Sequence, residues 1–169
     1  NRKGGLTFFE GMRLLSGVNL GAREGLELEV NGALTPNWQL AAGYTYNAAK
    51  YRKDAIASNE GRLFNSDLPR HLFKLSTSYR LNPQWTVGGS LAWQSLTYYQ
   101  QSAAPYARAD QRAYTLVGLM ARYDVDRQWS VTLNVNNLFD KTYMPGLGSY
   151  GTGVYGDPRN VLVTARYRF

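Results

Sequence analysis

The chain has 169 residues, the size of one ordinary domain. It contains no cysteine, which excludes a disulfide framework and a thiolate metal site. The net charge is +7, but the cationic residues are scattered along the chain instead of forming one patch, so nucleic acid is not expected as a partner. No apolar run approaches the ~20 residues that a membrane helix needs.

Alternation of apolar and polar residues with a period of two predicts β-strands along most of the chain. A first, less regular strand is expected within 6–18. The others are expected over 22–34, 38–51, 70–81, 85–98, 112–125, 128–143 and 157–169. Most of these segments are longer than the ~5–6 residues usual for soluble strands. They reach the ~9–11 residues with which a tilted strand crosses a bilayer.

Each predicted strand has an apolar row and a polar row, which must lie on opposite faces of a sheet. In the last ten residues, Arg166 and Arg168 belong to the polar row. The apolar row of this segment consists of Val161, Val163, Ala165, Tyr167 and Phe169. A charge at the bilayer centre costs ~2–4 kcal/mol, so uncharged outer rows favour a wall between lipid and a wet lumen. The expected fold class is all-β, a transmembrane antiparallel up-and-down β-barrel segment of about eight strands.

Three tight turns are each followed at once by tryptophan. They read LTPNW over 34–38, LNPQW over 81–85 and VDRQW over 125–129. Longer polar connections, over 52–69, 99–111 and 144–156, separate these hairpins. Tight turns at one end and long loops at the other are typical of outer-membrane barrels. The aromatic residues beside the tight turns are expected in the periplasmic membrane-interface girdle: Trp38, Trp85, Trp129, Tyr79, Tyr123 and Tyr167.

The segment NVNNLFDKTY over 134–143, followed by YGDPRN over 155–160 and a final strand ending in Phe169, resembles the C-terminal end of TonB-dependent receptors. The resemblance is strongest to ferric-siderophore receptors for hydroxamate and pyoverdine-type ligands. Three further segments resemble this family: REGLELE over 23–29, WQLAAGYTY over 38–46 and PRH over 69–71. Such receptors are barrels of about 22 strands with a plugged lumen. The resemblance implies that residues 1–169 are the C-terminal part of a receptor barrel, with the plug domain and TonB box absent.

The same resemblance implies a location in the bacterial outer membrane and a role in ferric-siderophore uptake. Outer-membrane lipid and lipopolysaccharide would be partners, and the TonB complex would act through the missing plug. The apolar row from Val161 to Phe169 resembles the signal read by the barrel-assembly machinery. Its physical basis would be β-augmentation, in which one exposed strand edge pairs with another.

Aromatic and cationic residues at the long-loop end are candidates for contact with a ferric siderophore. Rings can stack on the chelate and a cation can meet its negative charge. The candidates are Tyr98, Tyr99, Tyr106, Arg108 and Tyr150. Packing among the loops, or contact with lipopolysaccharide, is the alternative for these residues. The siderophore would be the transported ligand, and no cofactor is expected.

Other polar residues are expected to be structural. Asn136, Asn137 and Asp140 can satisfy backbone groups where a strand enters a loop. The single histidine, His71, cannot form a metal site or a catalytic triad alone. Glu27 and Glu29 share the inner row with Lys74 and Arg80 of another strand, so inner-wall ion pairing or contact with a plug is expected. No nucleophile elbow, phosphate loop or dinucleotide fingerprint occurs, and neither an enzyme nor a metal site is predicted.

Two other protein classes share parts of this pattern. One is a small, complete eight-stranded outer-membrane protein with a structural or adhesive role, whose interior is filled by side chains. The other is a soluble lipocalin-like binding module. A plug sequence upstream of Asn1 would exclude the first class, and aggregation of the purified chain in buffer without detergent would exclude the second.

Overall fold

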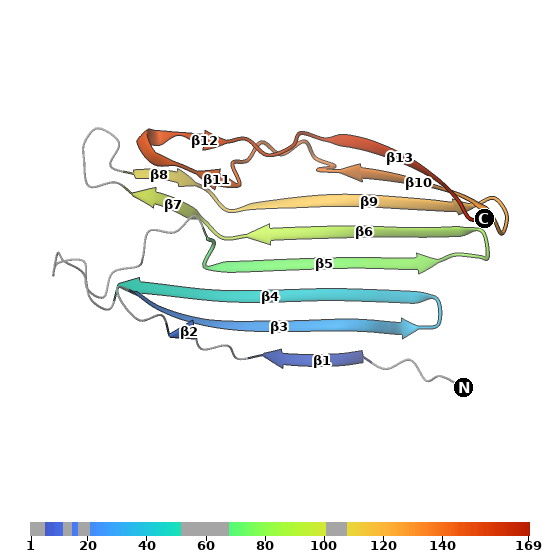
Figure 1. Cartoon of the computed structure of the whole chain (residues 1–169), viewed down its shortest axis with the longest axis horizontal. Coiled ribbons are helices and arrows are strands. Elements are labelled where there is room, and N and C mark those ends of the chain that lie inside the picture. Colours follow the sequence, from blue (N-terminus) through green and yellow to red (C-terminus); the bar gives the residue numbers. More distant parts are fainter. Residues whose placement is uncertain (1–5, 12–14, 17–20, 52–67, 101–107) are drawn as a thin grey trace.

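The computed structural model describes residues 6–11, 15–16, 21–51, 68–100 and 108–169 (Figure 1). The strands are β1 (Leu6–Gly11), β2 (Leu15–Ser16), β3 (Gly21–Thr35), β4 (Trp38–Tyr51), β5 (His71–Arg80), β6 (Trp85–Gln94), β7 (Thr97–Gln100), β8 (Arg108–Gln111), β9 (Tyr114–Asp124), β10 (Trp129–Asn136), β11 (Gly146–Leu147), β12 (Gly153–Val154) and β13 (Asn160–Tyr167). A short 3-10 helix, η2 (Ser149–Gly151), separates β11 from β12. No helix in the described ranges is long and apolar enough to cross a membrane.

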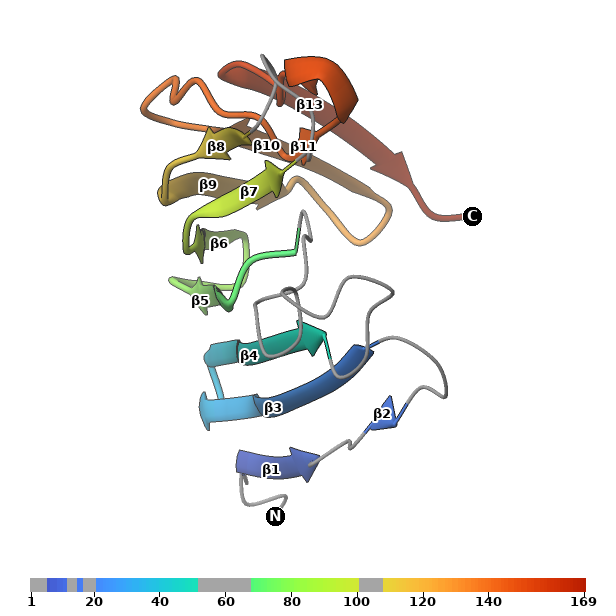
Figure 2. The same ribbon diagram turned by 90° about the vertical axis from the view of Figure 1, so that its left-hand side faces the viewer.

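The main sheet is an antiparallel meander in the order β1-β3-β4-β5-β6-β9-β10-β13, with β2 paired beside β3. This arrangement confirms the predicted all-β, up-and-down fold class. Figure 2 shows β1 and β13 at opposite edges of an open wall. Among the described strands, β1 pairs with β3 and β13 pairs with β10, and the two edges do not meet. The alternative of a closed eight-stranded barrel is therefore not supported.

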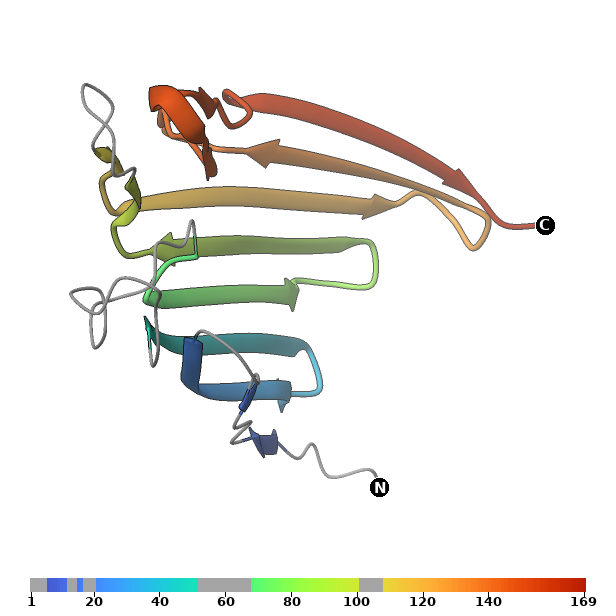
Figure 3. The same cartoon turned by 60° about the vertical axis from the view of Figure 1, so that its left-hand side comes forward.

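The three tryptophan-headed turns join β3 to β4, β5 to β6 and β9 to β10, and they lie at the same end of the sheet (Figure 3). In the second turn, Oδ1 of Asn82 accepts the backbone N–H groups of Gln84 and Trp85 at 2.9 and 2.8 Å. In the third, Oδ1 of Asp126 accepts those of Gln128 and Trp129, both at 2.7 Å. These bonds fix the turn before the returning strand begins, which explains why the polar-turn-then-tryptophan pattern marks a hairpin.

The predicted strands over 85–98 and 112–125 are too long at the loop end. β6 ends at Gln94. The next residue, Ser95, closes the strand pair with His71 of β5 by two hydrogen bonds. The Ser95 N–H donates to the His71 carbonyl at 2.9 Å, and the His71 N–H donates to the Ser95 side-chain hydroxyl at 3.0 Å. The chain then turns into β7, which pairs with β8 in a separate hairpin. The connection predicted over 99–111 therefore includes a strand, and β9 starts only at Tyr114.

The predicted strand over 128–143 is wrong beyond β10, which ends at Asn136. Asn137 and Asp140 have φ of 48° and 53°, in the left-handed region that ends strand pairing. Similarly, the connection predicted over 144–156 contains the β11–β12 hairpin, and the last strand spans 160–167 instead of 157–169. The other boundaries of the main sheet agree with the prediction to within one residue, apart from the first strand, which is divided into β1 and β2.

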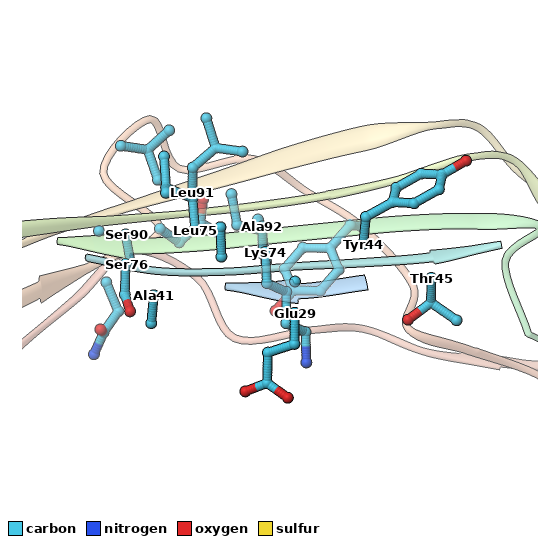
Figure 4. A pocket seen from close by; sticks show the side chains of 18 of the residues that line it. Glu29, Ala41, Tyr44, Thr45, Lys74, Leu75, Ser76, Ser90, Leu91 and Ala92 are labelled. Atoms are coloured by element: carbon cyan, nitrogen blue, oxygen red, sulfur yellow. The ribbon is translucent and has the colours of Figure 1, made fainter. Parts of the chain in front are cut away.

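The sheet is a single layer and has almost no core of its own. Within the described residues, only Ala48, Tyr114 and Leu147 are buried apolar residues. The two faces differ as predicted: Figure 4 shows Tyr44 and Leu91 on one side and Glu29 and Thr45 on the other. A wall of this kind is stable only if lipid covers its apolar face and water or protein covers its polar face.

Candidate functional site

The β7–β8 hairpin at the long-loop end brings two of the predicted ligand residues together. The guanidinium carbon of Arg108 lies 4.4 Å from the centroid of the Tyr98 ring. Tyr98 is directly opposite Asp110 in the hairpin, and Arg108 Nε donates to Oδ1 of Asp110 at 2.7 Å. This pair is about half exposed, with 47% and 45% of the two side chains accessible. Sequence reasoning missed Asp110, which neutralises the cation that was expected to face an anionic chelate.

The β11–β12 hairpin lies beside the β7–β8 hairpin and extends the same surface (Figure 1). The Met144 N–H donates to Oε1 of Gln111, the last residue of β8, at 2.8 Å, and the ring centroids of Tyr114 and Tyr143 are 4.7 Å apart. Tyr150, in η2, is 70% exposed and has φ of 61°. The two hairpins therefore form one platform with aromatic rings on it.

The other predicted ligand residues do not lie together with Tyr98 and Arg108 at one site. Tyr99 follows Tyr98 in β7, so its side chain projects from the opposite face of the hairpin. Tyr106 lies outside the described residues. The structure thus places one aromatic-cation pair on the β7–β8 hairpin and one exposed tyrosine on the neighbouring β11–β12 hairpin.

The polar face of the sheet forms an open recess of about 770 Å³ in its middle (Figure 4). Glu29 pairs across Gly43 with Lys74, so the carboxylate and the ammonium are two strands apart on one face. The two ion pairs within the described residues are Arg108–Asp110 and Arg122–Asp124. The predicted ion pairing of Glu27 and Glu29 within the wall is therefore not observed there, and both carboxylates are exposed to the lumen side.

The aromatic residues beside the tight turns form pairs across neighbouring strands. Trp38 meets Tyr79 edge-on at 6.3 Å between ring centroids. Trp85 and Tyr123 are 4.8 Å apart, and Trp129 and Tyr167 are 4.9 Å apart. Phe169 continues this row, 5.1 Å from Tyr167. The predicted girdle residues thus lie together along one end of the apolar face, the place that an interface girdle would occupy.

A second aromatic group surrounds His71 at the opposite end of the same face. The Tyr44 hydroxyl and Nδ1 of His71 are hydrogen-bonded at 2.8 Å, and the Tyr46 ring is 5.2 Å from the imidazole. Arg70 donates to the Tyr46 hydroxyl at 3.0 Å. These contacts are consistent with the structural or interfacial role predicted for His71. Within the described residues, no group of three His, Cys, Asp or Glu side chains could hold a metal ion.

Asn137 and Asp140 make hydrogen bonds to backbone groups as predicted, whereas Asn136 donates to Oδ1 of the Asn160 side chain at 2.8 Å. Asn137 is buried, and its side-chain amide donates to the carbonyls of Lys141 and Asp157 at 2.9 and 3.0 Å, while its Oδ1 accepts the Lys141 N–H at 2.8 Å. Oδ1 of Asp140 accepts the Arg159 N–H at 2.8 Å. The NLFD motif therefore ties the exit from β10 to the entry into β13.

β13 forms one edge of the sheet, and all of its residues are exposed. Val161 and Val163 are more than 60% accessible, and Phe169 is fully exposed. The predicted assembly residues therefore occupy a strand whose outer edge has no partner among the described strands.

Comparison with known proteins decides the family. Residues 7–138 match the family described as "TonB dependent receptor-like, beta-barrel". The chain belongs to this family. It is 40% identical over 149 residues to the ferric-pyoverdine BN7/BN8 receptor of Pseudomonas putida, covering 86% of this chain and 17% of that protein.

Two crystal structures of receptors for ferric siderophores share the fold. The ferripyoverdine receptor of the outer membrane of Pseudomonas aeruginosa, bound to ferripyoverdine, matches with a TM-score of 0.75 and 35% identity over 87% of this chain and 19% of that one. The ferric-catecholate import receptor Fiu from Escherichia coli K12, in its closed form, matches with a TM-score of 0.76 and 26% identity over 97% and 24%. The chain thus spans about a fifth of the length of these receptors. The predicted resemblance and the outer-membrane location are confirmed.

Proposed function

We propose that this chain forms the C-terminal part of the barrel wall in an outer-membrane receptor that imports a ferric siderophore. The observation that carries the proposal is the open, single-layer sheet with an apolar and a polar face, which pairs neither edge strand with the other. Such a sheet must continue into further strands, and its receptor relatives are about five times as long. The proposed activity is transport, for which the chain contributes wall and loop surface and no catalytic group.

The transported ligand is proposed to be a ferric siderophore of the pyoverdine type. Identity to the Pseudomonas putida ferric-pyoverdine receptor is 40%, compared with 29% to the catecholate siderophore receptor Fiu of Escherichia coli. The platform of the β7–β8 and β11–β12 hairpins lies at the long-loop end, where a ligand would arrive from outside. Tyr98 and Tyr150 offer ring faces there, and Arg108 contributes the part of its guanidinium that Asp110 does not occupy.

The partners proposed for the whole protein follow from this assignment. Lipid would cover the apolar face, and lipopolysaccharide would meet its loop end near Arg70 and His71. The open edge of β13, with Val161, Val163 and Phe169, would be recognised by the barrel-assembly machinery through strand pairing. Energy from the TonB complex would act through a plug outside residues 1–169.

Uptake of radiolabelled iron by the full-length parent protein tests the ligand assignment. The parent is expressed in a Gram-negative host that lacks its own siderophore receptors and is offered iron as ferric pyoverdine, a ferric hydroxamate or a ferric catecholate. We expect TonB-dependent uptake from ferric pyoverdine. Equal uptake in a host without TonB, or uptake from the catecholate alone, would contradict the proposal.

A further inference from the structure

The connection between β10 and β13, here termed the rim arm (residues 137–159), is a paired stem instead of an open loop. At its base, the side chain of Asn137 binds backbone groups on both limbs. Further along, the Gly156 N–H donates to the Tyr143 carbonyl at 2.9 Å, and β11 then pairs with β12. The rim arm ends in η2, where Tyr150 is exposed. Hydrogen bonds therefore join its two limbs from the wall toward the tip.

The two limbs of the rim arm are also packed closely against each other. A Cβ on Gly156 would overlap the ring of Tyr143. A Cβ on Gly153 would lie 2.8 Å from Sδ of Met144, closer than a real Cβ contact. Leu147 of β11 is one of the few buried apolar residues in the described part of the chain, with 8% of its surface accessible. Such packing leaves the limbs little space to move against each other.

The ring of Tyr143 also attaches the rim arm to the wall. Its centroid lies 4.7 Å from that of Tyr114, a buried residue at the start of β9. The next residue, Met144, donates its N–H to Oε1 of Gln111 in β8 at 2.8 Å. Figure 1 shows β11 beside β8 at this end of the sheet. One side chain, that of Tyr143, therefore touches both the wall and the second limb of the rim arm at Gly156.

These contacts fix the place of the residue at the tip of the rim arm. A binding group that is already held in place loses less conformational entropy when its ligand arrives. We propose that Tyr143 is a positioning residue for siderophore capture. Through Tyr114 and Gly156 it holds the rim arm against the wall, so that Tyr150 meets the siderophore at a site formed before the ligand binds. This inference rests on the proposed function, because it takes Tyr150 as a contact of the ferric siderophore.

Binding of ferric pyoverdine to variants of the full-length parent protein tests whether Tyr143 acts through Tyr150. Tyr143→Ala and Tyr150→Ala should each raise the dissociation constant about 3- to 10-fold, because each removes the benefit of one aromatic contact. The double variant should bind no more weakly than Tyr150→Ala alone, since a positioning residue has no separate effect on the ligand.

Two further variants change the ring contact in other ways. Gly156→Ala puts a methyl group where the Tyr143 ring lies and should weaken binding as Tyr143→Ala does. Tyr143→Phe keeps the ring and should restore binding. The matched control is Tyr155→Ala, which removes an exposed tyrosine of the same arm and should leave the dissociation constant unchanged. Additive losses in the double variant, or full affinity in Tyr143→Ala, would overturn the inference.

A distance measurement that needs no ligand keeps the two proposals separate. Spin labels are attached to Val154→Cys in β12 and Arg112→Cys in the wall of the full-length protein, both exposed positions. We expect a narrow distribution of distances that ferric pyoverdine leaves unchanged, and a broad one when Tyr143→Ala is added. A broad distribution that narrows only when ferric pyoverdine binds would overturn the preformed site. A parent protein that binds no ferric pyoverdine contradicts the proposed ligand, whereas the distances still report whether Tyr143 holds the rim arm in place.

Discussion

Asn137 stands where the wall passes into the loop that leads to β11. It adopts φ of 48°, a conformation that asparagine accepts more readily than most residues, and it is buried. Its amide joins backbone groups of Lys141 and Asp157, two points that are 16 residues apart in the chain. One side chain therefore supplies both the turn conformation and hydrogen-bond partners for backbone groups in the connection between β10 and β13.

Replacing this asparagine should loosen the loop locally. Asn137→Ala removes three hydrogen bonds of ~1 kcal/mol each and leaves a Cβ at positive φ, so we expect the loop to open more easily by about 2–4 kcal/mol. Asn137→Gly removes the same hydrogen bonds, but glycine adopts a positive φ without a steric cost. The loop of the glycine variant should therefore open less easily than the loop of the alanine variant. Hydrogen exchange of residues 138–160 in the full-length receptor measures the difference. Unchanged exchange in the alanine variant would show that the motif is not what ties β10 to β13.

Tyr98 carries the ring contact with Arg108 on the platform where ferric pyoverdine is proposed to bind. Tyr98→Ala removes the surface over which Arg108 sits, and an aromatic contact or an exposed cation–π pair contributes ~0.5–1.5 kcal/mol. We expect the dissociation constant for ferric pyoverdine to rise about 3- to 10-fold in the full-length protein, measured by fluorescence titration. Tyr155→Ala is the control, because Tyr155 is exposed between β12 and β13 and away from the Arg108 contact. If both variants bind equally well, the ligand does not use the β7–β8 hairpin.

At the scale of the element, β6 contains two adjacent glycines that face opposite sides of the wall. A Cβ on Gly88 would lie 2.6 Å from the Thr77 carbonyl oxygen, a backbone atom that cannot move aside. A Cβ on Gly89 would meet its nearest atom at 3.5 Å, an ordinary contact. Gly88→Ala should therefore destabilise the folded full-length barrel by about 1–3 kcal/mol, and Gly89→Ala by less than ~0.5 kcal/mol. Urea titration of both variants in lipid vesicles compares their stabilities. Equal midpoints would show that β5 and β6 accommodate a Cβ at position 88 without strain.

The two faces of β10 can be compared in the same way. Leu133 lies on the apolar face and Asn134 on the polar face, near the middle of the strand. An arginine facing the bilayer centre costs ~2–4 kcal/mol, whereas one facing a wet lumen costs little. Leu133→Arg should therefore lower the stability of the full-length barrel in lipid vesicles by that amount. Asn134→Arg should leave the stability close to that of the parent protein. The reverse order would mean that the faces have been assigned the wrong way round.

Strands of the main sheet could be predicted because two physical signals coincide in them. Period-two alternation marks the faces, and an Asn or Asp in a tight turn before Trp85 or Trp129 marks the returning strand. Hairpins in the loops carry neither signal, since β8 and β11 have too few residues for an alternating row. The early end of β10 depends on Asn137, whose bonds to Lys141 and Asp157 exist only once both ends of the loop have come together.

The candidate site was less predictable for the same reason. Tyr98 and Arg108 are ten residues apart in the chain, and their contact follows from the register of β7 with β8. Asp110 was overlooked because a short polar strand looks like loop sequence.

At the scale of the whole molecule, the strands that the structure describes form a sheet with two open edges and two uncovered faces. β1 and β13 each present a row of unpaired backbone N–H and C=O groups, and such edges pair with other chains. Detergent can cover the apolar face but cannot supply backbone partners in register. The stability of the wall therefore depends on what pairs with these edges and covers these faces.

We therefore expect the isolated chain, residues 1–169, not to form a stable monomer. In detergent micelles it should associate edge to edge, because strand pairing satisfies the backbone groups of β1 and β13 that micelles leave exposed. Sedimentation of the isolated chain and of the full-length receptor in the same detergent measures this, with the receptor as the monomeric control. Hydrogen exchange then locates the effect, since amides of β5 and β6 should be protected in both samples and those of β13 only where a partner strand is present. A monomeric fragment with β13 protected would show that the edge is satisfied within the chain itself, and the wall would then have to curl into a smaller barrel than its relatives form.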